Sequence, residues 1–202
     1  MFKIDEPVIS NLSKEHKVIN KVLDGYESFK ENIDIFYTEI TNCKFEKTKF
    51  NEKLINNISI SDVVFINCDL SNIKFINSSF YRLKFINCKL CGTNFIDSTL
   101  SNIIIDSCSC MYLNFAGSKI KKLKIDNSNF KESTFNSNKL KEILLNNINL
   151  SKSMISNTPL KSVDLSSSNL EDIIIDLYSI KGAYINSYQA MDLINLLGVY
   201  IK

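Results

Sequence analysis

The residue types that support catalysis do not occur in this chain in the combinations and spacings that an active site needs. The one histidine, His16, lies near the N-terminus, and we expect it to be a solvated residue. A single histidine excludes Ser-His and Cys-His nucleophilic centres and metal sites built from several histidines. The five glycines form no phosphate-binding loop. The sequence therefore predicts a protein that is not an enzyme and that carries no cofactor and no metal.

The remaining candidates for chemistry are six cysteines: Cys43, Cys68, Cys88, Cys91, Cys108 and Cys110. Cys88 and Cys91 form a C-x-x-C pair, a spacing that can bind metal or be redox-active. An even number would also suit disulfides in a secreted chain. The first residues lack the basic start and apolar core of a secretory signal. We therefore expect a cytoplasmic protein with reduced thiols.

The bulk composition names no partner. The formal net charge is +2 at pH 7. No apolar run approaches the roughly 20 residues that a membrane-spanning helix needs, so we expect no membrane association. The adjacent carboxylates Glu171 and Asp172 are expected on a convex surface, whereas catalysis needs a concave site.

The chain is organised by a period of five residues. A large apolar residue stands at every fifth position from Ile35 to Ile185 without a slip, and all of them are Phe, Leu or Ile except Cys110. We call these residues the centres. This period fits neither an α-helix nor a flat strand. A fixed period held over this length indicates a repeat architecture.

The residue two positions before each centre is also restricted. It is usually small at positions ending in 8, such as Cys68 and Ser78, and often larger at positions ending in 3, such as Val63 and Leu83. The other three positions of each pentapeptide are mostly polar. Two of every five side chains are therefore expected to point inward and three outward.

Cys68-Asp69-Leu70-Ser71-Asn72 and Ser168-Asn169-Leu170 combine a small residue, Asp or Asn, and a leucine centre. This pattern resembles the pentapeptide-repeat family over about residues 31–186. The resemblance implies an all-β fold, a right-handed quadrilateral parallel β-helix with four pentapeptides per coil. Residues 20 apart would then stack about 4.8 Å apart. One inner column would contain Phe75, Phe95, Phe115, Phe135, Ile155 and Ile175, and another Cys68, Cys88 and Cys108. Cys88 would point inward and Cys91 outward.

Both ends of such a solenoid expose strand edges that need cover. We divide the chain into an N-terminal cap segment (1–30), the β-helix (31–186) and a C-terminal helix and tail (187–202). The spacing of Val18, Ile19, Val22 and Leu23 predicts an N-terminal helix that begins after Ser13 and ends at Gly25.

At the C-terminus, Ser187 is expected to be the N-cap of a helix that runs to Leu197, before Gly198 and a β-prone tail. Its apolar face contains Ala190, Leu193, Ile194 and Leu197. The helix either caps the rod alone or also joins two copies. The family resemblance implies a homodimer at this end, with Leu193, Ile194 and Leu197 as the contacts.

One outward face is basic. The face with the centres Ile120, Leu140, Leu160 and Ile180 carries Arg82, Lys119, Lys121, Lys122, Lys139, Lys141, Lys161 and Lys181. Lys121, Lys141, Lys161 and Lys181 should stack on successive coils, and we call these four residues the lysine stripe. It is either a solvated surface or a docking site for an acidic partner, protein or nucleic acid. Sparse aromatic residues disfavour stacked single-stranded nucleic acid.

The sequence thus predicts a non-catalytic protein-interaction rod whose partner it does not name. The resemblance implies an alternative, because the best-known members of the family mimic duplex DNA, bind DNA gyrase or topoisomerase IV, and influence fluoroquinolone sensitivity. Those type II topoisomerase modulators are typically acidic along the rod, and some carry loops that interrupt the repeat. This chain has a basic face and no insertion between residues 35 and 185.

Overall fold

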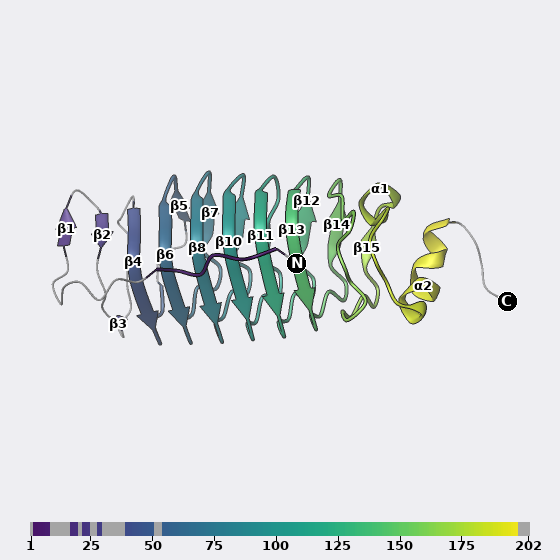
Figure 1. Cartoon of the computed structure of the whole chain (residues 1–202), viewed down its shortest axis with the longest axis horizontal. Coiled ribbons are helices and arrows are strands. Elements are labelled where there is room, and N and C mark those ends of the chain that lie inside the picture. The colour runs from purple at the N-terminus through teal and green to yellow at the C-terminus, as the bar shows by residue number, and fades with distance from the viewer. Residues whose placement is uncertain are drawn as a thin grey trace.

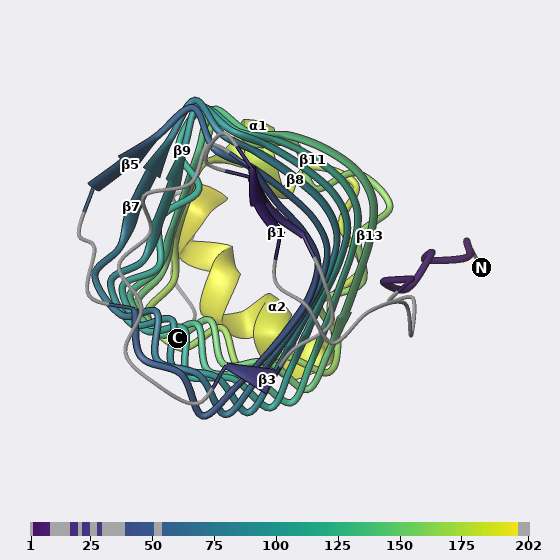
Figure 2. The same ribbon diagram turned by 90° about the vertical axis from the view of Figure 1, so that its left-hand side faces the viewer.

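The five-residue period winds the chain into a parallel β-solenoid of about seven turns, with short helices near the C-terminal end (Figure 1; Figure 2). The computed structural model describes residues 2–8, 17–19, 22–24, 28–29, 39–50 and 54–197. Paired strands are offset by 20 residues, so that Leu100 lies opposite Ile120 and Ile105 opposite Ile125. Each coil therefore contains four pentapeptides, and the predicted fold class is confirmed.

The largest sheet has nine strands and wraps two adjacent faces of the solenoid. It contains β1 (Lys17–Ile19), β2 (Val22–Asp24), β3 (Ser28–Phe29), β4 (Glu39–Glu46), β6 (Ser59–Ile66), β8 (Ser79–Ile86), β10 (Thr99–Asp106), β11 (Lys119–Asp126) and β13 (Lys139–Asn146). A third face contains two short sheets, of β5 (Leu54–Asn56), β7 (Lys74–Ile76) and β9 (Asn94–Ile96), and of β12 (Thr134–Asn136), β14 (Met154–Ser156) and β15 (Ile174–Ile175). Single bridges, such as Asp69 with Lys89, join the coils on the fourth face.

The chain turns each corner at the second residue after a centre, which we call the corner residue. Corner residues have left-handed backbone conformations, for example Asn102 with a φ of 57° and Lys122 with a φ of 56°. Asparagine tolerates this region better than most residues with a side chain. This preference gives a conformational reason for much of the asparagine in the repeat, at Asn42, Asn57, Asn67, Asn72, Asn77, Asn87, Asn102, Asn127, Asn147 and Asn157.

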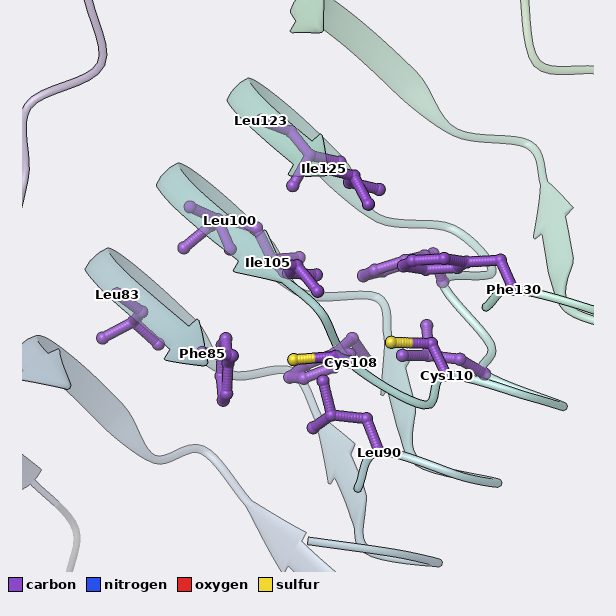
Figure 3. Packing of buried hydrophobic residues seen from close by; sticks show 14 of the residues in the cluster. Leu83, Phe85, Leu90, Leu100, Ile105, Cys108, Cys110, Leu123, Ile125 and Phe130 are labelled. Atoms are coloured by element: carbon purple, nitrogen blue, oxygen red, sulfur yellow. The ribbon is translucent and has the colours of Figure 1, made fainter. Parts of the chain in front are cut away.

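The centres fill the interior, as Figure 3 shows for residues from successive coils such as Phe85, Ile105 and Ile125. From position 40 onward every centre is buried except Leu140, Leu145, Ile180 and Ile185, which are half-buried; Ile35 lies outside the described residues. The predicted ring column is confirmed, since Phe75, Phe95, Phe115 and Phe135 stack at centroid distances of 5.3, 5.5 and 5.3 Å. A second ladder joins Phe45, Phe65 and Phe85 at 5.2 and 4.8 Å.

The strand ladder is broken on two faces between β13 and residues 159–166. The residues directly before the centres at 120 and 140 donate to the preceding coil. Lys119 N–H donates to Ser98 O at 2.9 Å, and Lys139 N–H donates to Ser118 O at 3.1 Å. Pro159 holds the next such position and has no N–H to donate. Within the described chain, no backbone hydrogen bond joins β13 to residues 159–166. The other two faces continue across this point through β12, β14 and the bridge from Asn149 to Asn169.

The break opens the core slightly. A void of about 30 Å³ lies beside it, lined only by apolar side chains that include Leu140, Leu145 and Leu165. Leu140 and Leu145 are half-buried centres on β13, the strand whose next neighbour is missing. Proline thus keeps the five-residue register but removes one ladder bond, and packing around the void is looser.

The expected N-terminal helix is wrong. β1 and β2 form an antiparallel pair with Ile19 opposite Val22, and β2 pairs with β4 in parallel with Leu23 opposite Ile40. Val18, Ile19 and Val22 are β-branched, which favours strands, and β2 covers the strand edge that β4 would otherwise expose. Ser13, His16 and Gly25 lie outside the described residues.

At the C-terminal end, α1 (Leu177–Ile180), α2 (Ser187–Leu193) and the 3-10 helix η1 (Ile194–Leu197) follow one another, and α2 lies across the end of the solenoid (Figure 1; Figure 2). The N-cap of α2 is Asn186 rather than the expected Ser187. Asn186 and Gln189 form a capping box in which each side chain accepts from the other residue's backbone N–H. Gln189, whose residue type completes a capping box, stands three positions after Asn186, whereas the residue three positions after Ser187 is Ala190. Gly198 and the tail after it lie outside the described residues.

Candidate interaction surface

The structure places the four residues of the lysine stripe outward and exposed, as predicted. Lys121 lies opposite Lys141 in the β11–β13 ladder, and Lys119 opposite Lys139 beside them. The ladder break falls between Lys141 and Lys161, so the stripe consists of two pairs of lysines. None of the four forms an ion pair with any residue that the structure describes. The stripe is therefore a group of like charges without a partner of opposite sign in the described chain.

A column of corner residues runs along the rod beside the stripe. It contains Asp62, Arg82, Asn102, Lys122, Glu142 and Ser162. Arg82 donates from Nε and Nη2 to the two carboxylate oxygens of Asp62 at 2.6 and 2.5 Å, and its guanidinium lies 4.4 Å from the ring centre of Tyr81. The forked ion pair and the aromatic ring hold both side chains in place.

Residues 2–8, which we call the strap, lie along this column. They run lengthwise over β11, β10, β8 and β6 on the outside of the ring (Figure 1; Figure 2). Asp5 Oδ2 lies 3.6 Å from Lys122 Nζ, and Glu6 Oε2 lies 3.3 Å from Lys84 Nζ. The strap carries no centre and does not follow the repeat, so sequence reasoning missed this contact.

A protein-family model described as a pentapeptide repeat region matches the sequence over residues 37–115 and, in a second overlapping match, over residues 58–135. The matches coincide with coils whose offset, inward centres and corner geometry are those described above. The chain belongs to the pentapeptide-repeat family. No curated protein matches this pentapeptide-repeat chain over its length.

Two solved structures of pentapeptide-repeat proteins are similar to this chain. A trypsin-treated form of QnrB1, a plasmid-mediated fluoroquinolone resistance protein, is 21% identical with a TM-score of 0.53, and the match covers 85% of this chain and 95% of that one. HetL, a pentapeptide-repeat protein involved in heterocyst differentiation regulation in the cyanobacterium Nostoc sp. strain PCC 7120, is 13% identical with a TM-score of 0.36, and covers 85% of this chain and 90% of its own. At 21% identity the likeness to QnrB1 concerns the fold alone.

Leu193 and Ile194, two of the residues expected at a dimer contact, are buried to different extents in this pentapeptide-repeat protein. Leu193 is 9% exposed and joins the core at the end of the rod. Ile194 is half-buried, and the side chain of Leu197 is not among those described. Leu193 thus covers the end of its own chain, and a homodimer through these residues stays a prediction.

Gln189, a polar residue that was not predicted from the sequence, seals the end of the rod. Gln189 is 5% exposed, and its Nε2 donates to Leu165 O at 2.8 Å and to Ser168 O at 2.6 Å. Leu165 O also accepts from Ser168 N–H at 2.8 Å, whereas among the described residues no backbone N–H donates to Ser168 O. A glutamine on α2 thereby satisfies Ser168 O, which the solenoid's end leaves open, and gives Leu165 O a second donor.

The cysteines lie where the repeat predicts. Cys68, Cys88 and Cys108 stack in one buried column, with Cys88 N–H 3.3 Å from Cys108 Sγ, and half-buried Cys91 points outward to Ser109. All six are thiols rather than half-cystines. The hydrogen bond with Cys108 and burial together raise the pKa of Cys88 to about 12. Burial raises the pKa of Cys110 well above its ordinary value. Across the described residues, no cluster of three or more His, Cys, Asp or Glu could hold a metal ion.

We predict that only Cys91 reacts quickly with a thiol reagent in the folded protein, because the other five thiols are buried and out of the reagent's reach. Ellman titration of the native protein should give one fast equivalent, and titration in denaturant should give six. A fast count of two or more in the native protein, or a denatured count of four or fewer, would contradict this expectation.

Among the described residues, no helix is long and apolar enough to cross a membrane.

Proposed function

We propose that this protein is a non-catalytic interaction rod that binds an acidic protein partner through the lysine stripe. The observation that carries the proposal is the exposed stripe itself, whose like charges have no ion-pair partner in the described chain. Neighbouring lysines about 5 Å apart repel by about 1 kcal/mol or less when fully solvated. An acidic partner relieves this repulsion.

The scaffold favours binding in a second way. Lys121 and Lys141 are held in register by the β11–β13 ladder, so little backbone entropy is lost when a partner docks. Binding that depends on exposed charges is screened within about 8 Å at physiological ionic strength. Capture should therefore weaken steeply as salt is added.

The test exchanges the four stripe lysines for glutamate. The matched control makes the same change at Lys47, Lys74, Lys89 and Lys152, which are equally exposed but scattered over other faces. Both variants should fold as the unaltered protein does, because all eight side chains point outward. We expect the stripe variant to lose a partner that the unaltered protein and the control variant both capture from a native lysate, as identified by mass spectrometry.

Equal capture by the stripe variant and the control variant would show that the stripe is only a solvated face. The Asn- and Ser-rich hollow that includes Asn127, Asn147 and Ser167 would then be the next surface to test.

The alternative function is modulation of a type II topoisomerase by mimicry of duplex DNA, with an effect on fluoroquinolone sensitivity. Only the fold shared with QnrB1 supports it. Mimicry of DNA requires a run of negative charge, and the stripe has the opposite sign. A gyrase supercoiling assay with the unaltered protein and the stripe variant separates the two. Inhibition by both to the same extent would favour the topoisomerase alternative over docking through the stripe.

A further inference from the structure

The strap fits the rod in register. Val8 N–H donates to Asp62 Oδ1 at 3.0 Å, and Asp5 N–H donates to Asn102 Oδ1 at 3.1 Å. The two acceptors are two coils apart, or about 9.6 Å, and three residues of an extended chain span about 10 Å. Phe2, three residues further, lines hollows with Leu144, two coils beyond Asn102. An extended segment can therefore contact every second coil without strain.

The side chains of the strap meet complementary groups. Phe2, Ile4 and Glu6 alternate along one edge of the strap and line a hollow with Lys84, Ile104, Lys124 and Leu144. Asp106 and Asp126 also line it, and Asp126 Oδ2 lies 2.6 Å from Lys124 Nζ. Ile104 is an outward-facing residue, yet it is 7% exposed. Apolar strap residues thus meet Ile104 and Leu144, and the acids Asp5 and Glu6 meet Lys122 and Lys84. We call Asp62, Lys84, Asn102, Ile104, Lys122 and Leu144 the strap groove.

The groove is fixed more firmly than the strap. Arg82 holds both oxygens of Asp62, and Asn102 is 4% exposed. The strap's own acids are largely in solvent, with side-chain exposures of 48% for Asp5 and 64% for Glu6. Exposed ion pairs of this kind contribute little and are screened by salt. A preorganised groove with a weakly held occupant can exchange that occupant.

We propose that the strap groove is a binding site for an extended peptide segment of a partner protein, with alternating apolar residues followed by two acids, and that residues 2–8 occupy it as an internal competitor. The strap of a second copy would have the same affinity as the strap already tethered there and would gain nothing by replacing it. A partner segment with more acids or larger apolar residues can displace it. The groove uses residues outside the lysine stripe, so this proposal and the proposed function can fail separately.

The test detaches the strap in the full-length chain with the pair Ile4→Asp and Asp5→Lys. The probe is an acetylated, fluorescein-labelled peptide with the sequence of residues 2–8, Phe-Lys-Ile-Asp-Glu-Pro-Val, and the measurement is fluorescence anisotropy. A tethered competitor acts at an effective concentration of about 1 mM. We therefore expect the strap variant to bind the probe at least about tenfold more tightly than the unaltered chain.

Two further variants make the result specific. Lys3→Gln changes an exposed strap residue and should leave probe binding as weak as in the unaltered chain. Adding Lys122→Asp to the strap variant should weaken binding of the probe by about tenfold, and a probe with lysine in place of its aspartate should recover that loss. Circular dichroism and thermal unfolding check that each variant is folded.

Equal binding of the probe by the strap variant and the unaltered chain would overturn the proposal. Equal binding of the original and the lysine-containing probe to the strap variant with Lys122→Asp would also overturn it. Sedimentation provides the remaining outcome. A concentration-dependent dimer of the unaltered chain that the strap variant lacks would identify the groove as a site of strap exchange between two copies, and would overturn its assignment to a partner protein.

Discussion

Replacing Phe115 with alanine is expected to lower the free energy of unfolding by about 3–5 kcal/mol. Phe115 is fully buried, and its ring stacks between Phe95 at 5.5 Å and Phe135 at 5.3 Å. The backbone around it is held by ladder bonds, including Phe115 N–H to Thr134 O at 3.0 Å. The coils cannot close on the cavity that alanine leaves, so both contact and transfer energy are lost.

Urea denaturation of the unaltered and Phe115→Ala proteins, with m-values compared, measures this loss. Tyr184→Ala is a matched control, because Tyr184 is an aromatic residue of the solenoid that is 62% exposed. We expect the control to change the stability by no more than about 0.5 kcal/mol. A loss below about 1 kcal/mol for Phe115→Ala would contradict the stacked column.

The second large effect is expected at the C-terminal end, where Gln189→Ala should destabilise the protein by about 2–4 kcal/mol. The substitution removes the donor to Leu165 O and Ser168 O and the acceptor for Asn186 N–H. A buried polar group left without a partner costs about 1–3 kcal/mol. The loss should also appear as faster hydrogen exchange in the last coils.

Met191→Ala serves as the control for this substitution, because Met191 is on the same helix and 55% exposed. It should have little effect on the midpoint of thermal unfolding. Identical midpoints for Gln189→Ala and Met191→Ala would show that the glutamine does not seal the rod.

The repeat predicted most of the solenoid, because each pentapeptide contains an apolar centre that points inward. The inward position of the centres and of Cys88 follows from that period, whereas the offset of 20 residues, and with it the column of Phe95 and Phe115, was implied by the resemblance to the pentapeptide-repeat family. Pro159 stands directly before the centre Leu160 and leaves the five-residue register unbroken. Its effect on the ladder was not predicted, because a missing N–H changes hydrogen bonding without changing the pattern of apolar residues.

The strap and the ends could not be predicted in this way. Asp5 bonds to Asn102 across 97 positions of sequence, and no local pattern encodes such a contact. The spacing of Val18, Ile19, Val22 and Leu23 suits a helix face and a hairpin equally, and pairing with β4 decides between them. Gln189 is buried because it contacts carbonyls of the last coils, Leu165 O and Ser168 O, and this contact depends on where the solenoid ends.

The ladder break at Pro159 has a consequence for how the rod unfolds. In a solenoid, stability is the sum of the stability of each coil and of the interfaces between nearest neighbours. The interface between β13 and residues 159–166 lacks the hydrogen bonds that join the earlier coils on the same two faces. We therefore expect cooperativity to be weak at this interface, and the coils from residue 159 onward to open as a separate unit at a lower free energy than the coils before them.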